Sequence, residues 1–116
     1  MPKNNAPCAT VKELMYNIYK NFIIHPDDEI KIVLHTSNER YKFVSFGTST
    51  DEYSHRLYAS NKKKMSLSAD DLLDELEKHN PKAHISVIDI DDGTVYSIVA
   101  MERDDKNQNN ILLYIS

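Results

Sequence analysis

The chain has 116 residues, a length that corresponds to one domain with a single hydrophobic core. Apolar residues make up 41% and charged residues 28%, as in an ordinary soluble globular protein. The two glycines, Gly47 and Gly93, are too few for any glycine-rich phosphate-binding loop. The single cysteine, Cys8, excludes an internal disulfide, a cysteine-rich zinc site and a C-x-x-C redox pair, and it fits a cytoplasmic protein.

The sequence also indicates that no membrane segment is present. The first ten residues lack the apolar centre of a signal peptide. No apolar run approaches the roughly 20 residues that are needed to cross a bilayer. We therefore expect no membrane span and a cytoplasmic location.

The first predicted element is a helix that begins after Thr10. Thr10 offers a side-chain acceptor at the N-cap and Glu13 offers a carboxylate three residues later, which is typical of a helix start. Apolar residues at helical spacing then form one stripe, made of Val11, Leu14, Met15 and Ile18. Pro26 cannot continue a helix, so the helix ends before it. Residues 1–9 are expected to form a flexible N-terminal tail with Cys8 in it.

Three strands are predicted to follow this helix, at residues 30–34, 41–46 and 55–60. If Ser37 and Asn38 form the loop of the first hairpin, Ile32 lies opposite Phe43 on the core side. Strict alternation then places the other side chains of the hairpin on the opposite sheet face, namely Lys31, Val33, Lys42, Val44 and Phe46.

The second half of the chain repeats this order. Ser68 with Asp71 marks the start of a second helix, whose apolar stripe is Leu72, Leu73 and Leu76. Strands are expected at residues 85–90, 95–101 and 110–116. The dipeptide Asp92-Gly93 is typical of a tight hairpin turn, and that turn would place Val87 opposite Ile98.

The two halves align with one another residue by residue. The offset is 58 in the helices, 55 in the first two strands and 56 in the third, and the identical pairs include Pro26/Pro81, Ile30/Ile85, Tyr41/Tyr96, Val44/Val99, Leu57/Leu113, Tyr58/Tyr114 and Ser60/Ser116. We predict a tandem αβββ repeat (αβββ-αβββ), with units at 10–60 and 68–116 joined by residues 61–67. The expected fold class is α+β, with an antiparallel or mixed sheet and two helices packed on one face.

No catalytic, cofactor-binding or metal-ligating residue is predicted. The five histidines show no helical i,i+4 pair and no companion cysteine, so no standard zinc spacing can be drawn, and His25 and His79 fit helix C-terminal capping better. Residues 89–93 resemble a calcium loop, but the glycine stands fifth and no glutamate follows at position twelve. The carboxylates of Asp27, Asp28 and Glu29 fall in a helix-to-strand turn, where solvated charge is the default.

Nucleic acid is not an expected partner. Lys62-Lys63-Lys64 is the only basic run, and it lies at the joint between the two halves. RNA-binding sheets usually add exposed aromatic residues in specific motifs, and this sequence has no such motif. We interpret the run as a solvated linker.

Charge is distributed unevenly along the chain. Residues 1–61 hold seven basic and seven acidic residues, whereas residues 65–116 hold four basic and eleven acidic ones. Acidic residues crowd the exposed side of the second helix, among them Asp74, Glu75 and Glu77. They either form a solubilising surface or recognise a basic protein partner.

The second face of the predicted sheet is partly apolar. Its candidate interaction residues are Val33, Val44, Phe46, Ile88 and Ile90. Such a face, left bare, would be a large exposed apolar patch for a monomer. We therefore expect a homodimer or a protein partner to cover it.

The sequence favours a small non-enzymatic protein-interaction module of bacterial or mobile-element type. The segment from Ser68 through Pro81 to Val87 resembles helix-to-strand segments of small bacterial and phage proteins, a resemblance that covers under a quarter of the chain and implies no chemistry. The alternative is a small-molecule binding or catalytic domain, with its site between the helix layer and the sheet.

Overall fold

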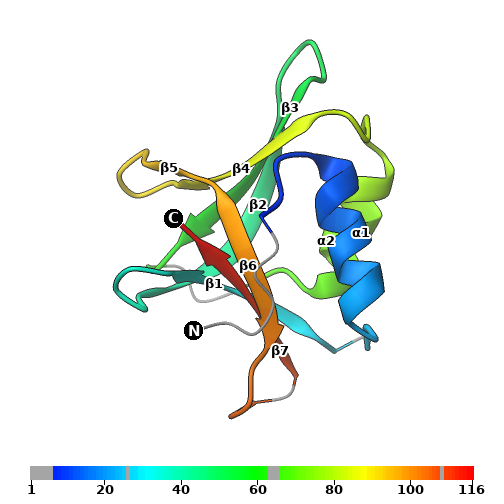
Figure 1. The fold of residues 1–116 in the computed structure, drawn as a ribbon. Coiled ribbons are helices and arrows are strands. Elements are labelled where there is room, and N and C mark those ends of the chain that lie inside the picture. The colour runs from blue at the N-terminus through cyan, green and yellow to red at the C-terminus, as the bar shows by residue number, and fades with distance from the viewer. Residues whose placement is uncertain (1–6, 26, 63–65, 108) are drawn as a thin grey trace.

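The computed structural model describes residues 7–25, 27–62, 66–107 and 109–116, without the side chain of Asn21. Within these residues the chain forms two helices and seven strands, in the order α1 (Val11–Asn21), β1 (Glu29–Leu34), β2 (Arg40–Thr48), β3 (Ser54–Ser60), α2 (Ala69–Glu77), β4 (His84–Asp89), β5 (Val95–Tyr96), β6 (Ile98–Arg103) and β7 (Asn110–Ile115). The strands form one mixed sheet in the order β5-β4-β3-β2-β1-β7-β6, so the fold is of the mixed α+β class (Figure 1).

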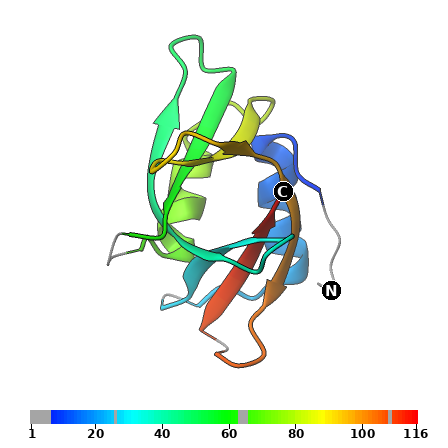
Figure 2. The same cartoon turned by 90° about the vertical axis from the view of Figure 1, so that its left-hand side faces the viewer.

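The sheet curves almost into a barrel. β5 and β6 stand at opposite ends of the strand order, yet only Ser97 separates them in the chain. Ser97 also exchanges backbone hydrogen bonds of 2.9 and 3.0 Å with Ser116, the residue after β7. These bonds join the β5–β6 connection to the end of β7. Figure 2 looks through the ring of strands, and both helices lie behind it. In a barrel the core side chains line the inner face of the sheet, and the outer face lies toward solvent.

The predicted helix-to-sheet core is confirmed. Its eight members are at most 2% exposed and belong to one apolar cluster: Leu14, Ile18, Ile32, Phe43, Leu72, Leu76, Val87 and Ile98. The third strand of each half adds further side chains to the cluster, among them Leu57, Ile111, Leu113 and Ile115. Burial of each large apolar side chain stabilises the fold by about 1.5–3 kcal/mol.

Both helices begin where the sequence predicts. The Thr10 side chain accepts a hydrogen bond of 3.2 Å from the Glu13 backbone N–H. The Ser68 hydroxyl accepts from the Asp71 N–H, and the Asp71 carboxylate accepts from the Ser68 N–H, which completes a capping box. Pro26, the predicted end signal of the first helix, lies outside the described residues, and α1 ends at Asn21.

The predicted hairpin registers are wrong by two residues in both halves. Ile32 pairs with Tyr41 rather than with Phe43, and Val87 pairs with Tyr96 rather than with Ile98. The loops hold four residues, 35–38 and 90–93, instead of two. The last residue of each loop has a positive φ, 60° at Asn38 and 80° at Gly93, but the first strand of each hairpin ends two residues earlier than a two-residue turn would require.

A β-bulge in β2 changes the direction of Phe46. The register between β2 and β3 shifts between Phe43 and Ser45, and one extra residue, Val44, stands in β2. Because an extra residue reverses the alternation, Phe46 packs against the core and its ring lies 4.9 Å from the ring of Phe43. The expectation that Phe46 lies on the outer face is therefore wrong.

The segment before α1 is part of the sheet rather than a free tail. Cys8 donates its backbone N–H to Ile98 in β6, and Ile85 in β4 donates to the carbonyl of Ala9. The Cys8 side chain is only 3% exposed, so the expectation of a flexible tail is wrong for residues 7–9. Residues 1–6 lie outside the described part of the chain.

Two similar backbone hydrogen bonds join the start of each helix to the other half of the chain. Val11 donates to Ala83 at 2.9 Å, and Ala69 donates to Asp28 at 2.9 Å. In the sheet, β1 pairs with β7 in parallel and β3 pairs with β4 in parallel. A second bulge lies in β6, between Ile98 and Ala100.

Candidate interaction surface

Three acidic residues of α2 were predicted as interaction residues. Asp74 and Glu77 are exposed, as expected, on the outer side of this helix. Glu75 is half-buried and lies 2.8 Å from the His79 ring nitrogen Nε2, so it faces a neighbour in its own chain. Two of the three carboxylates are therefore open to solvent.

The outer side of α1 carries large apolar and aromatic side chains. Tyr16 and Tyr19 are 61% and 55% exposed and lie three residues apart, on one side of the helix, and Ile23, two residues beyond the end of α1, is 80% exposed. The core stripe of α1, including Leu14 and Ile18, points the other way, so these side chains contribute nothing to the core.

A hydrogen bond joins the outer sides of the two helices. The Tyr19 hydroxyl donates to the Glu77 carboxylate at 2.7 Å. This hydrogen bond, with burial and the nearby charges of Glu77 and Asp74, raises the pKa of Tyr19 above its ordinary value. We give the name helix-pair surface to the exposed residues on the outer sides of the two helices and just beyond α1, namely Tyr16, Tyr19, Ile23, Asp74 and Glu77. It presents aromatic rings beside carboxylates.

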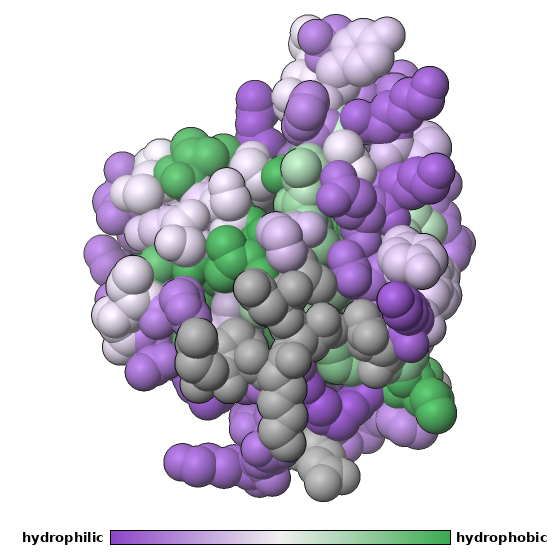
Figure 3. Space-filling view, viewed as in Figure 1, coloured by the Kyte–Doolittle hydropathy of each residue, from purple (hydrophilic) through white to green (hydrophobic). Residues whose placement is uncertain are grey.

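The outer face of the barrel is less apolar than the sequence predicts. Val33 is buried, whereas Val44 and Ile88 are half-buried and Ile90, in the turn after β4, is 42% exposed. Val95, which pairs with Ile88 across the β4–β5 ladder, is 63% exposed. Figure 3 shows a hydrophobic patch over β4 and β5 and another below the end of α1, on a face that is otherwise mostly hydrophilic.

One helix-to-barrel corner contains a buried ion pair. The Asp28 carboxylate is fully buried, and the two guanidinium nitrogens of Arg103 donate to its oxygens at 2.9 and 3.2 Å. Arg103 also donates to the Ile23 carbonyl at 2.9 Å, which holds the loop after α1. The expectation that Asp28 is a solvated turn residue is therefore wrong. The sequence does not reveal this ion pair, because Arg103 lies 75 residues away along the chain.

The other corner, between α2 and β3, contains two histidines. The His55 ring is fully buried and lies 4.3 Å, centroid to centroid, from the His79 ring. His55 Nδ1 is 3.0 Å from the Thr48 hydroxyl, and His55 Nε2 is buried without a hydrogen-bond partner among the described residues. Burial, followed by the charge of His79, lowers the pKa of His55 to about 4, against an opposing effect of Glu75.

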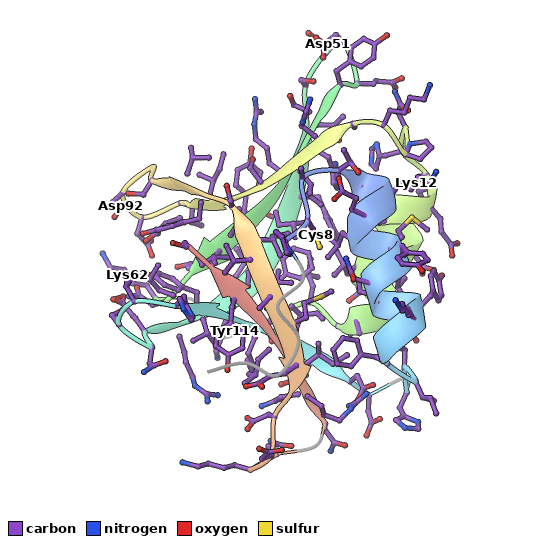
Figure 4. All side chains as sticks on the ribbon, in the orientation of Figure 1. Cys8, Lys12, Asp51, Lys62, Asp92 and Tyr114 are labelled. Atoms are coloured by element: carbon purple, nitrogen blue, oxygen red, sulfur yellow. The ribbon has the colours of Figure 1, made fainter. Side chains whose placement is uncertain are left out.

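A hollow of about 460 Å³ opens beside Cys8, between the segment before α1 and strands β4 and β6. Glu13, His84 and Ser97 line it, but most of its other lining residues are apolar. Burial raises the pKa of the Cys8 thiol despite a hydrogen bond from Asn17, so the thiol is protonated at neutral pH. Figure 4 places Cys8 between the barrel and α1. The hollow offers no activated nucleophile.

Within the described part of the chain, no three side chains of His, Cys, Asp or Glu type gather in a way that could hold a metal ion. Neither α1 nor α2 is long and apolar enough to span a membrane, and no other described segment forms such a helix. Of the basic run at 62–64, Lys62 is exposed and Lys63 and Lys64 lie outside the described residues.

No protein-family model, curated protein or solved structure matches this chain.

Proposed function

We propose that the protein is a non-enzymatic interaction module that binds a basic protein segment through the helix-pair surface. The observation that carries this proposal is the group of exposed side chains Tyr16, Tyr19 and Ile23 beside the carboxylates of Asp74 and Glu77. These three side chains do not stabilise the core, so their exposure at and just beyond the outer side of α1 needs another reason.

The chemistry of the surface defines the partner. Tyrosine is enriched among the residues that dominate binding energy at interfaces, because it buries a large rigid ring and keeps a polar hydroxyl. Lysine and arginine side chains bind both to aromatic faces and to carboxylates. Lys20, whose ammonium lies 5.5 Å from the Tyr16 ring centroid, already makes such a contact within the chain. A partner with alternating basic and apolar side chains therefore fits best.

We also infer that the chain is a tandem repeat of one αβββ unit. Two backbone hydrogen bonds support this. Val11 donates to Ala83, and Ala69, which corresponds to Val11 at the helix offset of 58, donates to Asp28, which corresponds to Ala83 at the strand offset of 55. The two hairpin loops also support the repeat. Each ends on a residue with a positive φ, Asn38 or Gly93, and these two residues are 55 positions apart. The bulges in β2 and β6 also correspond under that offset.

The repeat gives a reason for the composition of the helix-pair surface. At the helix offset of 58, Tyr19 corresponds to Glu77 and Tyr16 corresponds to Asp74. The Tyr19–Glu77 hydrogen bond thus joins two equivalent positions, as is expected where two copies of a unit meet at a pseudo-twofold axis. One copy contributes rings and the other contributes carboxylates, so the surface suits an asymmetric partner better than a second copy of itself.

We further propose a cytoplasmic location, since the single Cys8 leaves no intramolecular disulfide to be maintained by an oxidising compartment. A homodimer through the outer barrel residues Val44, Ile88 and Ile90 is the competing interaction. Sedimentation of the wild-type protein at high micromolar concentration separates the two, because our proposal predicts a monomer.

Binding of a synthetic peptide tests the proposal. The probe is a helical peptide of about 18 residues with lysine and leucine on opposite faces, and the matched peptide carries glutamate in place of lysine. We expect the basic peptide to bind, and we expect Asp74→Lys/Glu77→Lys and Tyr16→Ser/Ile23→Ser each to weaken its binding about tenfold or more in fluorescence anisotropy. These substitutions are at exposed positions, so circular dichroism should show an intact fold.

The matched control is Asp92→Lys/Asp105→Lys, which reverses two exposed charges elsewhere. Asp92 lies in the β4–β5 turn, on the opposite side of the molecule from the helices (Figure 4). The control should bind the basic peptide nearly as well as the wild type does. Equal weakening by this control would show that the peptide responds to net charge alone, and the acidic helix would then be a solubilising surface.

A further inference from the structure

The end of α2 rests on the barrel through the pair of histidines. His79 follows the last turn of α2, and its ring lies 4.3 Å from the ring of His55 in β3. His79 Nε2 is 2.8 Å from Glu75, one helical turn back. Since His55 is fully buried, any charge on this ring lies inside the protein, directly beside the second imidazole.

The groups around His55 do not compensate such a charge well. From β2, Phe46 stacks on the ring at 5.9 Å and Thr48 offers a hydroxyl at 3.0 Å to Nδ1. From β4, the neighbour in the ladder is Ile85. From α2, the acting groups are His79, which disfavours a charge on His55, and Glu75, which favours it but is already engaged by His79. A protonated imidazole carries an N–H on both ring nitrogens, and His55 Nε2 has no hydrogen-bond partner among the described residues.

The corresponding corner at the end of α1 has the opposite electrostatics. There Arg103 donates to Asp28 and to the Ile23 carbonyl, which ties the loop after α1 to β6. Burial opposes the charge on Asp28, but the hydrogen bonds from Arg103 and from the His25 N–H outweigh it and lower the pKa of Asp28. Mild acid leaves this ion pair charged, so α1 should keep its attachment.

We propose that protonation of the buried His55 ring, which lies beside His79, releases the end of α2 from the barrel in mildly acidic solution while α1 stays attached. This inference rests on the proposed function for its consequence: the release would separate Glu77 from Tyr19 and disable the helix-pair surface. The protein would then bind its partner near neutral pH and let it go in acid.

The size of the effect follows from proton linkage. The pKa of His55 is about 4 while its ring is buried, and its ordinary value is 6.5. Proton linkage then makes the equilibrium constant for release of α2 about 30 times larger at pH 5 than at pH 7.5. The charge of His79 is one of the causes of this lowered pKa, so its effect is already contained in the figure of about 30-fold.

Hydrogen exchange of the backbone amides tests this release without any partner. At pH values of about 7.5 and 5, after correction for intrinsic exchange rates, we expect the opening equilibrium of the last turn of α2 to rise about 30-fold in acid. The amides of α1 serve as the internal control and should change less than about threefold. Equal opening of both helices, or of neither, would overturn the proposal.

Two variants separate the histidine pair from general acid effects. His55→Phe keeps a planar ring on Phe46 but cannot be protonated, so α2 should open equally at both pH values. If that variant does not fold, His79→Gln provides the test, because it retains a donor for Glu75 and removes the second charge; its acid response should be clearly smaller. An unchanged acid response in the folded variant contradicts the inference.

The histidine resonances of the wild-type protein give a second readout. The His55 imidazole should titrate near pH 4, and the inference is wrong if it titrates near 6.5. Failure of the basic peptide to bind would remove the proposed function but leave a measured release of α2 standing. Conversely, the peptide could bind equally at pH 7.5 and 5 with no opening of α2. That result would contradict the acid release and leave the proposed function intact.

Discussion

Removal of Arg103 should destabilise the fold strongly. Asp28 is fully buried, and its carboxylate accepts hydrogen bonds of 2.9 and 3.2 Å from Arg103 and of 2.8 Å from the His25 backbone N–H. Arg103→Thr introduces the residue type found at the corresponding position of the other half, Thr48, and leaves the carboxylate without its charged partner. A buried charge that loses its partner costs about 3–5 kcal/mol, and we expect the free energy of unfolding to fall by that amount.

The pH dependence of this variant gives an independent check. In the wild type the pKa of Asp28 is lowered, so its contribution to stability is present above the unfolded-state value of 3.8 and is lost as the pH falls through the folded-state value. Without Arg103, burial dominates and raises the pKa of Asp28. Relative to the wild type, Arg103→Thr should therefore recover stability as the pH falls from 7 to 5.

Urea unfolding followed by circular dichroism measures both effects. The double variant Asp28→Ala/Arg103→Thr removes both charges, and we expect it to lose less stability than the sum of the two single variants, with a coupling energy of about 2–3 kcal/mol. The reasoning is refuted if Arg103→Thr costs less than about 1 kcal/mol or if the single effects are additive.

Four further substitutions test the fold. Leu72→Ala, at a fully buried position of α2, should cost about 2–5 kcal/mol in urea unfolding, and a cost below about 0.5 kcal/mol would contradict its place in the core. Gly93→Ala should cost about 1–2 kcal/mol because φ is 80° there, whereas Asn38→Gly, where φ is 60°, should not lower stability. Ser68→Ala removes the capping box of α2 and should lower thermal stability by about 1 kcal/mol, while an unchanged midpoint would show that the cap is dispensable.

The features that the sequence predicts correctly are local ones. The N-caps at Thr10 and Ser68 and the apolar stripes of both helices depend on residues within one or two turns, so spacing alone reveals them. The core residues of the strands follow from alternation, which holds as long as no bulge interrupts it. Phe46 lies beyond a bulge, and for that reason its side was predicted incorrectly.

The features that the sequence does not reveal depend on distant pairs. Closure of the sheet requires that β6 meet β7 while β5 meets β4, although a single residue, Ser97, separates β5 from β6 in the chain. Asp28 meets Arg103 across 75 residues, and no local pattern marks that pairing. His55 could have been found more easily, because it alternates with Leu57 and Ala59 on the inward side of β3 and is the one titratable residue in that series.

The exposed tyrosines of the helix-pair surface were also overlooked. Tyr16 and Tyr19 stand outside the predicted core stripe of the first helix, so the sequence already placed them in solvent. What it could not show is that Tyr19 reaches Glu77 of the second helix, since this contact depends on how the two helices lie together.

The most direct test of the helix-pair surface is a map of backbone amide chemical shifts during titration with the basic peptide. Our account predicts that the largest changes fall on the outer turns of α1 and α2, around Tyr16, Tyr19 and Glu77, and that the amides of β4 and β5 barely change. Changes centred on the outer barrel around Ile88, Ile90 and Val95, or spread over every acidic loop, would contradict it.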